Sequence, residues 1–522
     1  MRVAGPVWYV ATVNMRQSPE APGRSTAGAP AETELHRHRR RILVLTCVGS
    51  FMTPLDGSIV AVALRSMGES LHLTYNEAIW VQTAYLLAIS VLLIPFGRLA
   101  DEHGRMRFYL AGVIVFTLGS VAAGLAPSAG LLIGARVVQG AGGALLGATA
   151  AALVTATFPP SERGRALGYT VMAVYIGLSV GPPLGGFIVD HFTWPTAADA
   201  WRWIFFVNVP VGVITLLAGW PLLHAERADR ARTGATPAIS IDVAGVALLT
   251  VMLSALLVPL TFSTSWGWGS PATIGLLVLS ALAAVAFVLV ESRVHDPVFD
   301  LDLLRHNRLF ATANLAALLN YAAMNGVTIL TAVFLQVVQH RPAQVAGLLL
   351  LAQPIIMAVL APVFGQWSDR VGTRFLSTGG MFVIAAGLLL LSAVPDDATT
   401  AHIMGALAIV GLGMAAFSTP NTSAVMGSVQ RSQLSVAGSF LGTMRFTGQA
   451  ISVALLGAIA GSQLGAEGGK VIFLGARAVN AADLYANGYR LAMAVAAGLA
   501  LVGGLVSLTR PAADPTGEAV RH

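Results

Sequence analysis

The stretch that decides the fold is ILVLTCVGSFMTPLDGSIVAVAL, residues 42–64. It is an apolar run long enough to cross a bilayer as a helix, and it contains one acid, Asp56. A carboxylate among Leu, Val, Ile and Phe is costly to hold at membrane depth, and such residues usually mark the path of a proton, an ion or a substrate. The other twenty-four Asp and Glu fall in tails, loops or predicted helix ends. Asp56 is therefore the first candidate functional residue.

Composition indicates a polytopic membrane protein. Of 522 residues, 55% are hydrophobic and 11% are charged, against about 25% charged in ordinary soluble domains. The net charge of +6 comes from arginines that flank apolar runs, so we expect membrane lipid and not nucleic acid as a partner. The sequence contains no phosphate-binding loop and no credible set of metal ligands. We therefore expect no enzyme, no metal site and no cofactor.

Apolar runs bounded by charges or turn residues predict an all-α protein with fourteen membrane-spanning helices. The predicted spans are 42–64, 78–96, 108–126, 131–157, 166–189, 203–223, 243–263, 272–290, 309–338, 344–364, 375–394, 402–427, 436–461 and 490–509. Residues 1–41 and 511–522 are predicted to be cytoplasmic tails, the first of them disordered. Because nothing before Met15 looks structured, translation from Met15 is a hypothesis that an N-terminal mass would test.

The distribution of basic residues predicts the orientation. Twenty Lys and Arg flank the spans on the side of the N-terminus and six lie on the opposite side. Because basic loops stay in the cytoplasm, we expect both termini there. The single Lys among thirty Arg is typical of a GC-rich bacterial genome, so the expected location is a bacterial cytoplasmic membrane.

Two loops repeat the pattern G-x-x-x-D-x-x-G, which is GRLADEHG at 97–104 and GQWSDRVG at 365–372. The spacing predicts two six-helix halves separated by two inserted helices. The expected boundaries are 42–223 for the N-terminal half, 224–308 for a linker with two extra helices, and 309–510 for the C-terminal half.

Together these features resemble the major facilitator superfamily, in particular its fourteen-helix drug:proton antiporter branch. The resemblance covers roughly residues 42–510 and is carried by LDGSIVAVAL (55–64), GRLADEHGRMR (97–107), RVVQG (136–140), GLSVGPPLGG (177–186) and WRWIFFVNVP (201–210). It implies the major facilitator fold and transport by alternating access.

The resemblance also implies roles for two motifs. The repeated loop would latch the halves through Gly97, Asp101, Gly104, Arg105, Asp369 and Arg370, although Glu102 stands where the family commonly has a basic residue. The glycine-rich helix is typical of exporters that exchange substrate for protons, and its motif residues are Gly177, Gly181, Pro182, Gly185 and Gly186. A plain topogenic turn and simple helix packing are the alternatives.

Depth connects Asp56 to Arg136. Asp56 is about 14 residues into its predicted span, or about 21 Å, and Arg136 is about 5 residues into its own span from the other side. An Arg beside Asp56 would lower the pKa of the carboxyl, and the apolar surroundings would raise it. A substrate that changes either effect could therefore drive proton release. The family's helix 4 Arg is linked to proton transfer, a role that maps onto Arg136. A static ion pair is the alternative.

Polar residues on helices that line the central cavity of this fold are the candidate substrate contacts. These are Tyr85, Gln139, Tyr175, Asn314, Asn320, Tyr321, Asn325, Gln353, Asn421, Arg445 and Gln449, each of which could also serve helix packing. One embedded acid opposed by Arg136 and Arg445 favours neutral, zwitterionic or monovalent cationic substrates over dications.

The sequence therefore predicts a monomeric, proton-coupled exporter of lipophilic or amphipathic small molecules that uses the proton gradient. A dedicated exporter of one metabolite, such as an antibiotic, a siderophore or a lipid, is one alternative. A non-transporting membrane receptor on the same scaffold is another.

Overall fold

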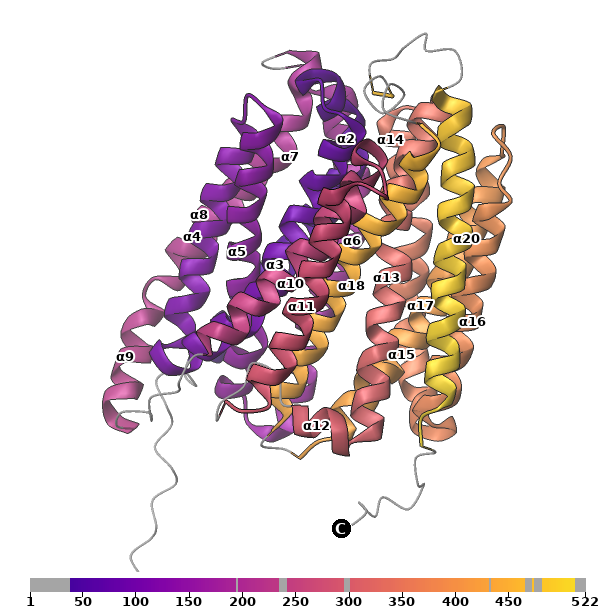
Figure 1. The fold of residues 1–522 in the computed structure, drawn as a ribbon. Coiled ribbons are helices and arrows are strands. Elements are labelled where there is room, and N and C mark those ends of the chain that lie inside the picture. The colour runs from indigo at the N-terminus through magenta and orange to yellow at the C-terminus, as the bar shows by residue number, and fades with distance from the viewer. Residues whose placement is uncertain are drawn as a thin grey trace, which may run out of the picture.

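Fourteen helices of the computed structural model are long and apolar enough to cross a membrane, which confirms the predicted all-α fold. The structure describes residues 38–193, 196–233, 242–294, 301–430, 433–464, 472–473 and 481–511. In Figure 1 the indigo and purple helices of the first half lie on the left, and the orange and yellow helices of the second half lie on the right.

The first half consists of five long helices and a sixth span built from shorter pieces. The five are α2 (Arg39–Leu71), α3 (Tyr75–His103), α4 (Arg105–Gly124), α5 (Ala129–Thr157) and α6 (Pro160–His191). The sixth span contains η1 (Ala197–Arg202), α7 (Trp203–Phe206) and α8 (Asn208–Gly219). A polar helix, α9 (Leu222–Thr233), follows it.

Two inserted helices, α10 (Val243–Trp266) and α11 (Pro271–Glu291), and a short helix, α12 (Leu301–His306), lead to the second half. The second half contains α13 (Arg308–Val333), η2 (Phe334–Val338), α14 (Ala343–Leu350), α15 (Ala352–Val371), α16 (Thr373–Ser392), α17 (Thr400–Gly427), α18 (Leu434–Ser462) and α20 (Ala481–Leu508). The tenth span is divided at Leu351 into α14 and α15.

The predicted ends of several spans were wrong, and the first and last helices are examples. The first helix continues past residue 64 to Leu71, and the last begins at Ala481 and not near 490. The apolar runs stop at polar residues, but the helices continue because their inner faces stay buried. In the last helix, the Tyr485 hydroxyl donates to the Leu330 carbonyl oxygen at 3.1 Å, and the Tyr489 and Thr331 hydroxyls lie 3.1 Å apart.

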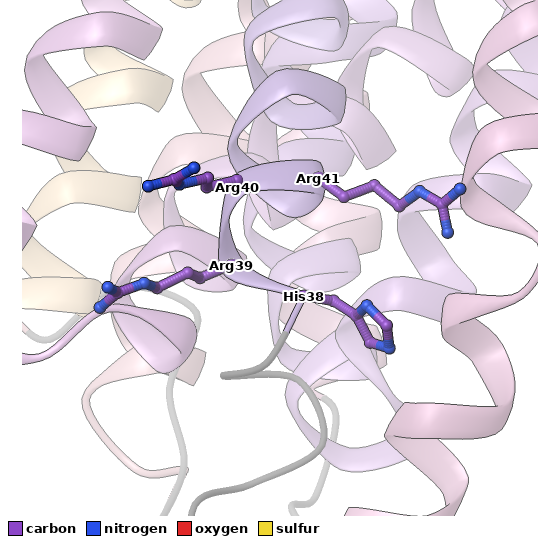
Figure 2. A pocket seen from close by; sticks show the side chains of 4 residues that line it. All are labelled: His38, Arg39, Arg40 and Arg41. Carbon is purple, nitrogen blue, oxygen red and sulfur yellow. The ribbon is translucent and has the colours of Figure 1, made fainter.

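We name the two ends of the bundle by where α2 begins and ends. The basic end holds the start of α2, and Figure 2 shows His38, Arg39, Arg40 and Arg41 there, with their side chains spread around the helix. Helices α9 and α12 lie at this end, at the bottom of Figure 1. The opposite end holds His72, where α2 terminates in a left-handed residue with φ 53°.

Helices α3 and α18 form a long contact between the halves. The Ser90 and Thr447 hydroxyls are 2.5 Å apart across it, and a Cβ atom on Gly442 would lie 2.9 Å from Leu93. The inserted pair α10 and α11 adds Leu249, Leu253 and Phe287 to an apolar cluster with residues of both α3 and α18. The insert therefore covers a seam between the halves.

Candidate functional site

The glycine-rich face of α6 places Asp56 in the interior. A Cβ atom on Gly177 would lie 2.6 Å from the Phe51 carbonyl oxygen, and one on Gly181 would lie 1.9 Å from Ser58 Oγ. A Cβ atom on Gly185 would lie 2.8 Å from the Ile59 carbonyl oxygen. Only glycine allows backbones to approach this closely, so α6 seals one side of α2 around Asp56.

Asp56 is completely buried and its carboxylate accepts three side-chain hydrogen bonds. Arg136 Nη1 donates to Oδ2, and the amide nitrogens of Gln139 and Asn208 donate to Oδ1 at 2.6 and 3.0 Å. These donors come from α5 and from the first residue of α8. The carboxylate is therefore paired with one charge and two amides.

Arg136 is also fully buried, and its other donors are satisfied. Its Nε donates to the Val81 carbonyl oxygen at 3.0 Å, Nη2 to Gln82 Oε1 at 3.2 Å, and Nη1 also to Gln139 Oε1 at 2.5 Å. The guanidinium carbon lies 4.1 Å from the centre of the Tyr85 ring. Because removing one partner of a buried pair costs about 3–5 kcal/mol, we expect this network to be sensitive to the loss of either charge.

Sequence reasoning had paired Asp56 with Arg136 but had given no role to Gln82, Ser120 or Asn208. Gln139 Nε2 also donates to Ser120 Oγ at 2.8 Å, which ties α4 to the centre. Asn208 lies within the quoted segment 201–210 and is the one amide in it. An isolated amide in an apolar segment was the signal that could have identified it.

The first repeated loop is held within the first half. Arg105 Nε donates to Asp101 Oδ1 at 2.6 Å, and Arg105 Nη1 donates to the Ala152 carbonyl oxygen of α5 at 3.3 Å. Gly104 has φ 117°, a conformation that favours glycine. A Cβ atom there would also lie 2.8 Å from the Glu226 carboxylate, whereas one on Gly97 would meet only Ala148 at 3.7 Å.

Glu226 of α9 caps the helix that follows this loop. It is 7% exposed and accepts from the backbone N–H groups of Met106 and Arg107 at 2.9 and 3.2 Å. A carboxylate is favourable at the N-terminus of a helix. Sequence reasoning missed Glu226, although a carboxylate shortly after a span is a possible cap for a neighbouring helix.

The second repeated loop has the same turn. Gly372 has φ 89°, and Arg370 is exposed in the last turn of α15. The Asp369 side chain lies outside the described part of the structure. The latch roles of Asp369 and Arg370 remain predictions.

Four residues from four helices meet where the halves face each other. Tyr175 of α6 lies close to Ser418 of α17 and is within electrostatic range of Tyr321 on α13 and Arg445 on α18. We call these four residues the Arg445 cluster. The guanidinium carbon of Arg445 is 5.0 Å from the Phe446 ring centre, and its Nε is buried without a hydrogen-bond partner.

The predicted cavity residues divide into two groups. Tyr175, Tyr321, Asn325, Gln353, Arg445 and Gln449 are partly exposed. The buried group does not line an accessible space in this conformation: Tyr85 donates to the Thr53 carbonyl oxygen, Gln139 binds Asp56, Asn320 donates to Met381 Sδ and Asn421 accepts from Arg510. Asn314 is also buried, and its amide donates to the Phe310 carbonyl oxygen. Their helices turn these side chains toward neighbouring helices.

The halves are tightly joined at the opposite end. Asp190 at the end of α6 accepts from the backbone N–H groups of Ala343 and Gln344 at 3.3 and 2.7 Å. Gln336 Nε2 donates to the Val62 carbonyl oxygen at 3.0 Å. A Cβ atom on Gly186 would lie 2.4 Å from the Ala343 carbonyl oxygen. These contacts close that end between α6 and α14.

Sequence comparison assigns the family. The sequence model of the Major Facilitator Superfamily matches residues 46–451, and also 313–521. This chain belongs to the major facilitator superfamily. It is accordingly a multi-pass membrane transporter, and membership confirms the resemblance drawn from the motifs.

Three curated relatives are similar over most of the chain. The multidrug resistance protein Stp of Mycobacterium tuberculosis is 34% identical over 433 residues, covering 83% of this chain and 78% of its own. The tetracenomycin C resistance and export protein of Streptomyces glaucescens is 32% identical, covering 81% and 76%. The riboflavin transporter RibZ of Clostridioides difficile is 30% identical, covering 77% and 84%. The first two place the chain with the multidrug efflux type.

Solved structures share the fold. A bacterial homologue of the human lysosomal transporter Spinster aligns with a TM-score of 0.64 and 16% identity, over 90% of this chain and 96% of its own. A D-xylose-proton symporter aligns with a TM-score of 0.63 and 12% identity, over 92% and 99%. At these identities the likeness concerns the fold alone.

Proposed function

We propose that this transporter exports lipophilic or amphipathic compounds from the cytoplasm in exchange for protons, by alternating access. The observation that carries the proposal is the position of Asp56. Every other Asp or Glu in the described spans lies within three residues of a helix end, and Asp56 lies at the middle of α2. The tetracenomycin C resistance and export protein among the relatives supports export as the direction, and the multidrug resistance protein Stp supports drugs as substrates.

Asp56 is suited to carry a proton because its charge is held by groups from two other helices, α5 and α8. Protonation would remove the negative charge that Arg136 pairs with, and Arg136 would then be a buried cation without a carboxylate. Arg136 regains its carboxylate partner only when Asp56 releases the proton. While Asp56 is protonated, this ion pair no longer holds α5 against α2, and α5 can move. Proton binding is thereby coupled to the packing of these helices, in an equilibrium that substrate can bias in the opposite sense.

We place the basic end in the cytoplasm, since arginines accumulate there. In this orientation the closed contacts of Asp190, Gln336 and Gly186 face outward. The partly exposed Arg445 cluster would then be reached from the cytoplasm. That access favours loading of substrate from inside, as an exporter requires.

The test is uptake of two dyes of opposite charge, fluorescein and rhodamine 123, into inverted vesicles, driven by an imposed pH gradient. We expect the native chain to accumulate dye and Asp56→Asn at equal expression to lose gradient-driven accumulation. Asp483→Asn is the matched control, because Asp483 is an exposed acid in the first turn of α20. Full activity in Asp56→Asn would show that the proton is carried elsewhere.

A second candidate is a transporter dedicated to one metabolite. The riboflavin transporter and the tetracenomycin C exporter among the relatives favour it, because their names specify single compounds. Substrate breadth separates the two candidates. Proton-linked transport of one compound and of no other in a chemically varied panel would select the dedicated exporter.

A further inference from the structure

The Arg445 cluster combines residues from both halves. A Cβ atom on Gly448 of α18 would lie 2.9 Å from the Tyr321 Cβ of α13. Arg445 is three residues before Gly448, and residues at this spacing share a helix face. Gln449, four residues after Arg445, lies on the same face. With Tyr175 reaching Ser418 from α6, four helices converge on one place.

Two glutamine side chains near the cluster, those of Gln353 and Gln449, have amide groups that can bind a ligand. A Cβ atom on Gly411 would lie 2.5 Å from the Gln353 carbonyl oxygen, and Gly411 is two helical turns from Ser418 on one face of α17. Gln353 therefore borders the cluster toward the opposite end. The partly exposed Gln353 and Gln449 side chains make no hydrogen bond to other side chains within the described residues.

The charge of the cluster is positive and uncompensated. Asp56 is paired with Arg136 in a network that is fully buried in the first half. In the described spans of the second half, Asp369 and Asp483 are the acids, and both lie within three residues of a helix end. Arg445 thus has no carboxylate at its own depth. The Arg445 side chain is partly exposed but its Nε is buried without an acceptor, and a bound anion would supply one.

The surrounding groups define what that anion would be. A guanidinium presents two parallel N–H groups to a carboxylate and favours planar acids. The Tyr175 and Tyr321 rings add flat apolar walls, and their hydroxyls, with that of Ser418, can bind polar substituents of an aromatic system. An inorganic anion would leave these rings without a contact.

We propose that the Arg445 cluster is the substrate site and that it selects aromatic compounds carrying an anionic group, such as a carboxylate or an ionised phenol. This inference rests on the proposed export function and specifies its substrate class. It replaces the expectation of neutral or monocationic substrates, because that expectation counted Asp56 as facing the substrate. In the structure Asp56 is sealed against Arg136.

The test compares two xanthene dyes of similar shape and opposite charge, fluorescein and rhodamine 123. Binding to the purified full-length protein in lipid nanodiscs is measured by fluorescence polarisation. We expect fluorescein to bind at least tenfold more tightly than rhodamine 123. Arg445→Gln should remove this preference, whereas Arg445→Lys should retain part of it because the charge remains.

Arg490→Gln is the matched control, because Arg490 is also within a span and is paired with Asp396 at 2.5 Å. It should bind both dyes like the native protein. Tighter binding of rhodamine 123 by the native protein would overturn the inference without any variant. An equal loss of both dyes in a folded Arg445→Gln protein would also overturn it, since that result indicates a structural role.

The binding test is independent of proton coupling. Selective fluorescein binding without gradient-driven transport would refute the proposed function and keep the site. Gradient-driven transport without a preference for the anionic dye would refute the site and keep the proposed function.

Discussion

In the first half, Asp56 and Arg136 are both fully buried and bind each other. In the second half, Arg445 is partly exposed, its Nε has no hydrogen-bond partner, and no carboxylate lies at its depth in the described spans. Both centres lie inside a membrane bundle, where an uncompensated charge is costly. The first centre compensates its charges within the chain, whereas the described part of the structure shows no carboxylate that compensates the second.

This difference suggests a division of labour. In the proposed function, the charge pair enclosed by α2, α5 and α8 takes up the proton. In the proposed substrate site, the Arg445 guanidinium, which is within electrostatic range of Tyr175, binds the larger ligand. Each of the following predictions changes one centre and compares the result with the other.

The largest expected effect is on stability. Arg136→Ala leaves Asp56 buried without its counter-charge, and we expect a loss of about 3–5 kcal/mol together with loss of gradient-driven transport. Arg445→Ala removes a charge that has no partner, so its stability should stay within about 1 kcal/mol of native. Thermal unfolding in detergent micelles measures the contrast.

A double variant tests whether the unpaired charge of Asp56 causes the loss of stability in Arg136→Ala. Asp56→Asn combined with Arg136→Ala removes both charges, and it should recover part of the stability lost in Arg136→Ala, because contacting residues are not additive. Equal destabilisation by Arg136→Ala and Arg445→Ala would contradict the distinction between a paired and an unpaired centre.

An intermediate effect is expected from Asn208→Val. It removes the 3.0 Å hydrogen bond to Asp56 Oδ1 and leaves the Arg136 contact in place. A hydrogen bond to a charged group contributes about 1.5–3 kcal/mol, so gradient-driven dye uptake should fall about tenfold or more. Fluorescein binding at the second centre should stay within twofold of native. Parallel losses in uptake and binding would mean that the two centres are not separable.

Much of the fold could be predicted from sequence because membrane spans are long, apolar and bounded by charges. The fourteen spans were found in this way. The errors occurred at helix ends such as Leu71, His103 and Ala481, where helices continue beyond the apolar run. There, buried tyrosines such as Tyr485 and Tyr489 replace aliphatic residues, and hydropathy alone does not distinguish such a helix end from a loop.

The sites were harder to predict because composition does not give the direction of a side chain. Asp56 and Arg136 were identified because buried charges are rare, and their depths placed them within reach. An amide in an apolar segment indicates a polar contact but not its partner: Asn320 and Asn421 were expected near substrate, yet they face Met381 and Arg510. The convergence of Tyr175, Ser418 and Arg445 required the packing of the two halves, which no local pattern contains.

The smallest expected effect is from Tyr175→Phe at the second centre. The ring remains, and only the hydroxyl, which lies close to Ser418, is lost. A neutral hydrogen bond contributes about 0.5–1.5 kcal/mol, so fluorescein should bind about twofold to tenfold more weakly, with no change in stability beyond about 1 kcal/mol. Tyr169→Phe is the matched control, since Tyr169 is an exposed tyrosine of the same helix whose hydroxyl accepts only from Arg165 at 3.2 Å. If both variants bind fluorescein like the native protein, Tyr175 packs against the ligand without hydrogen-bonding it. If Tyr175→Phe instead abolishes pH-driven uptake at native binding affinity, its hydroxyl belongs to the proton path, and the separation of the two centres fails.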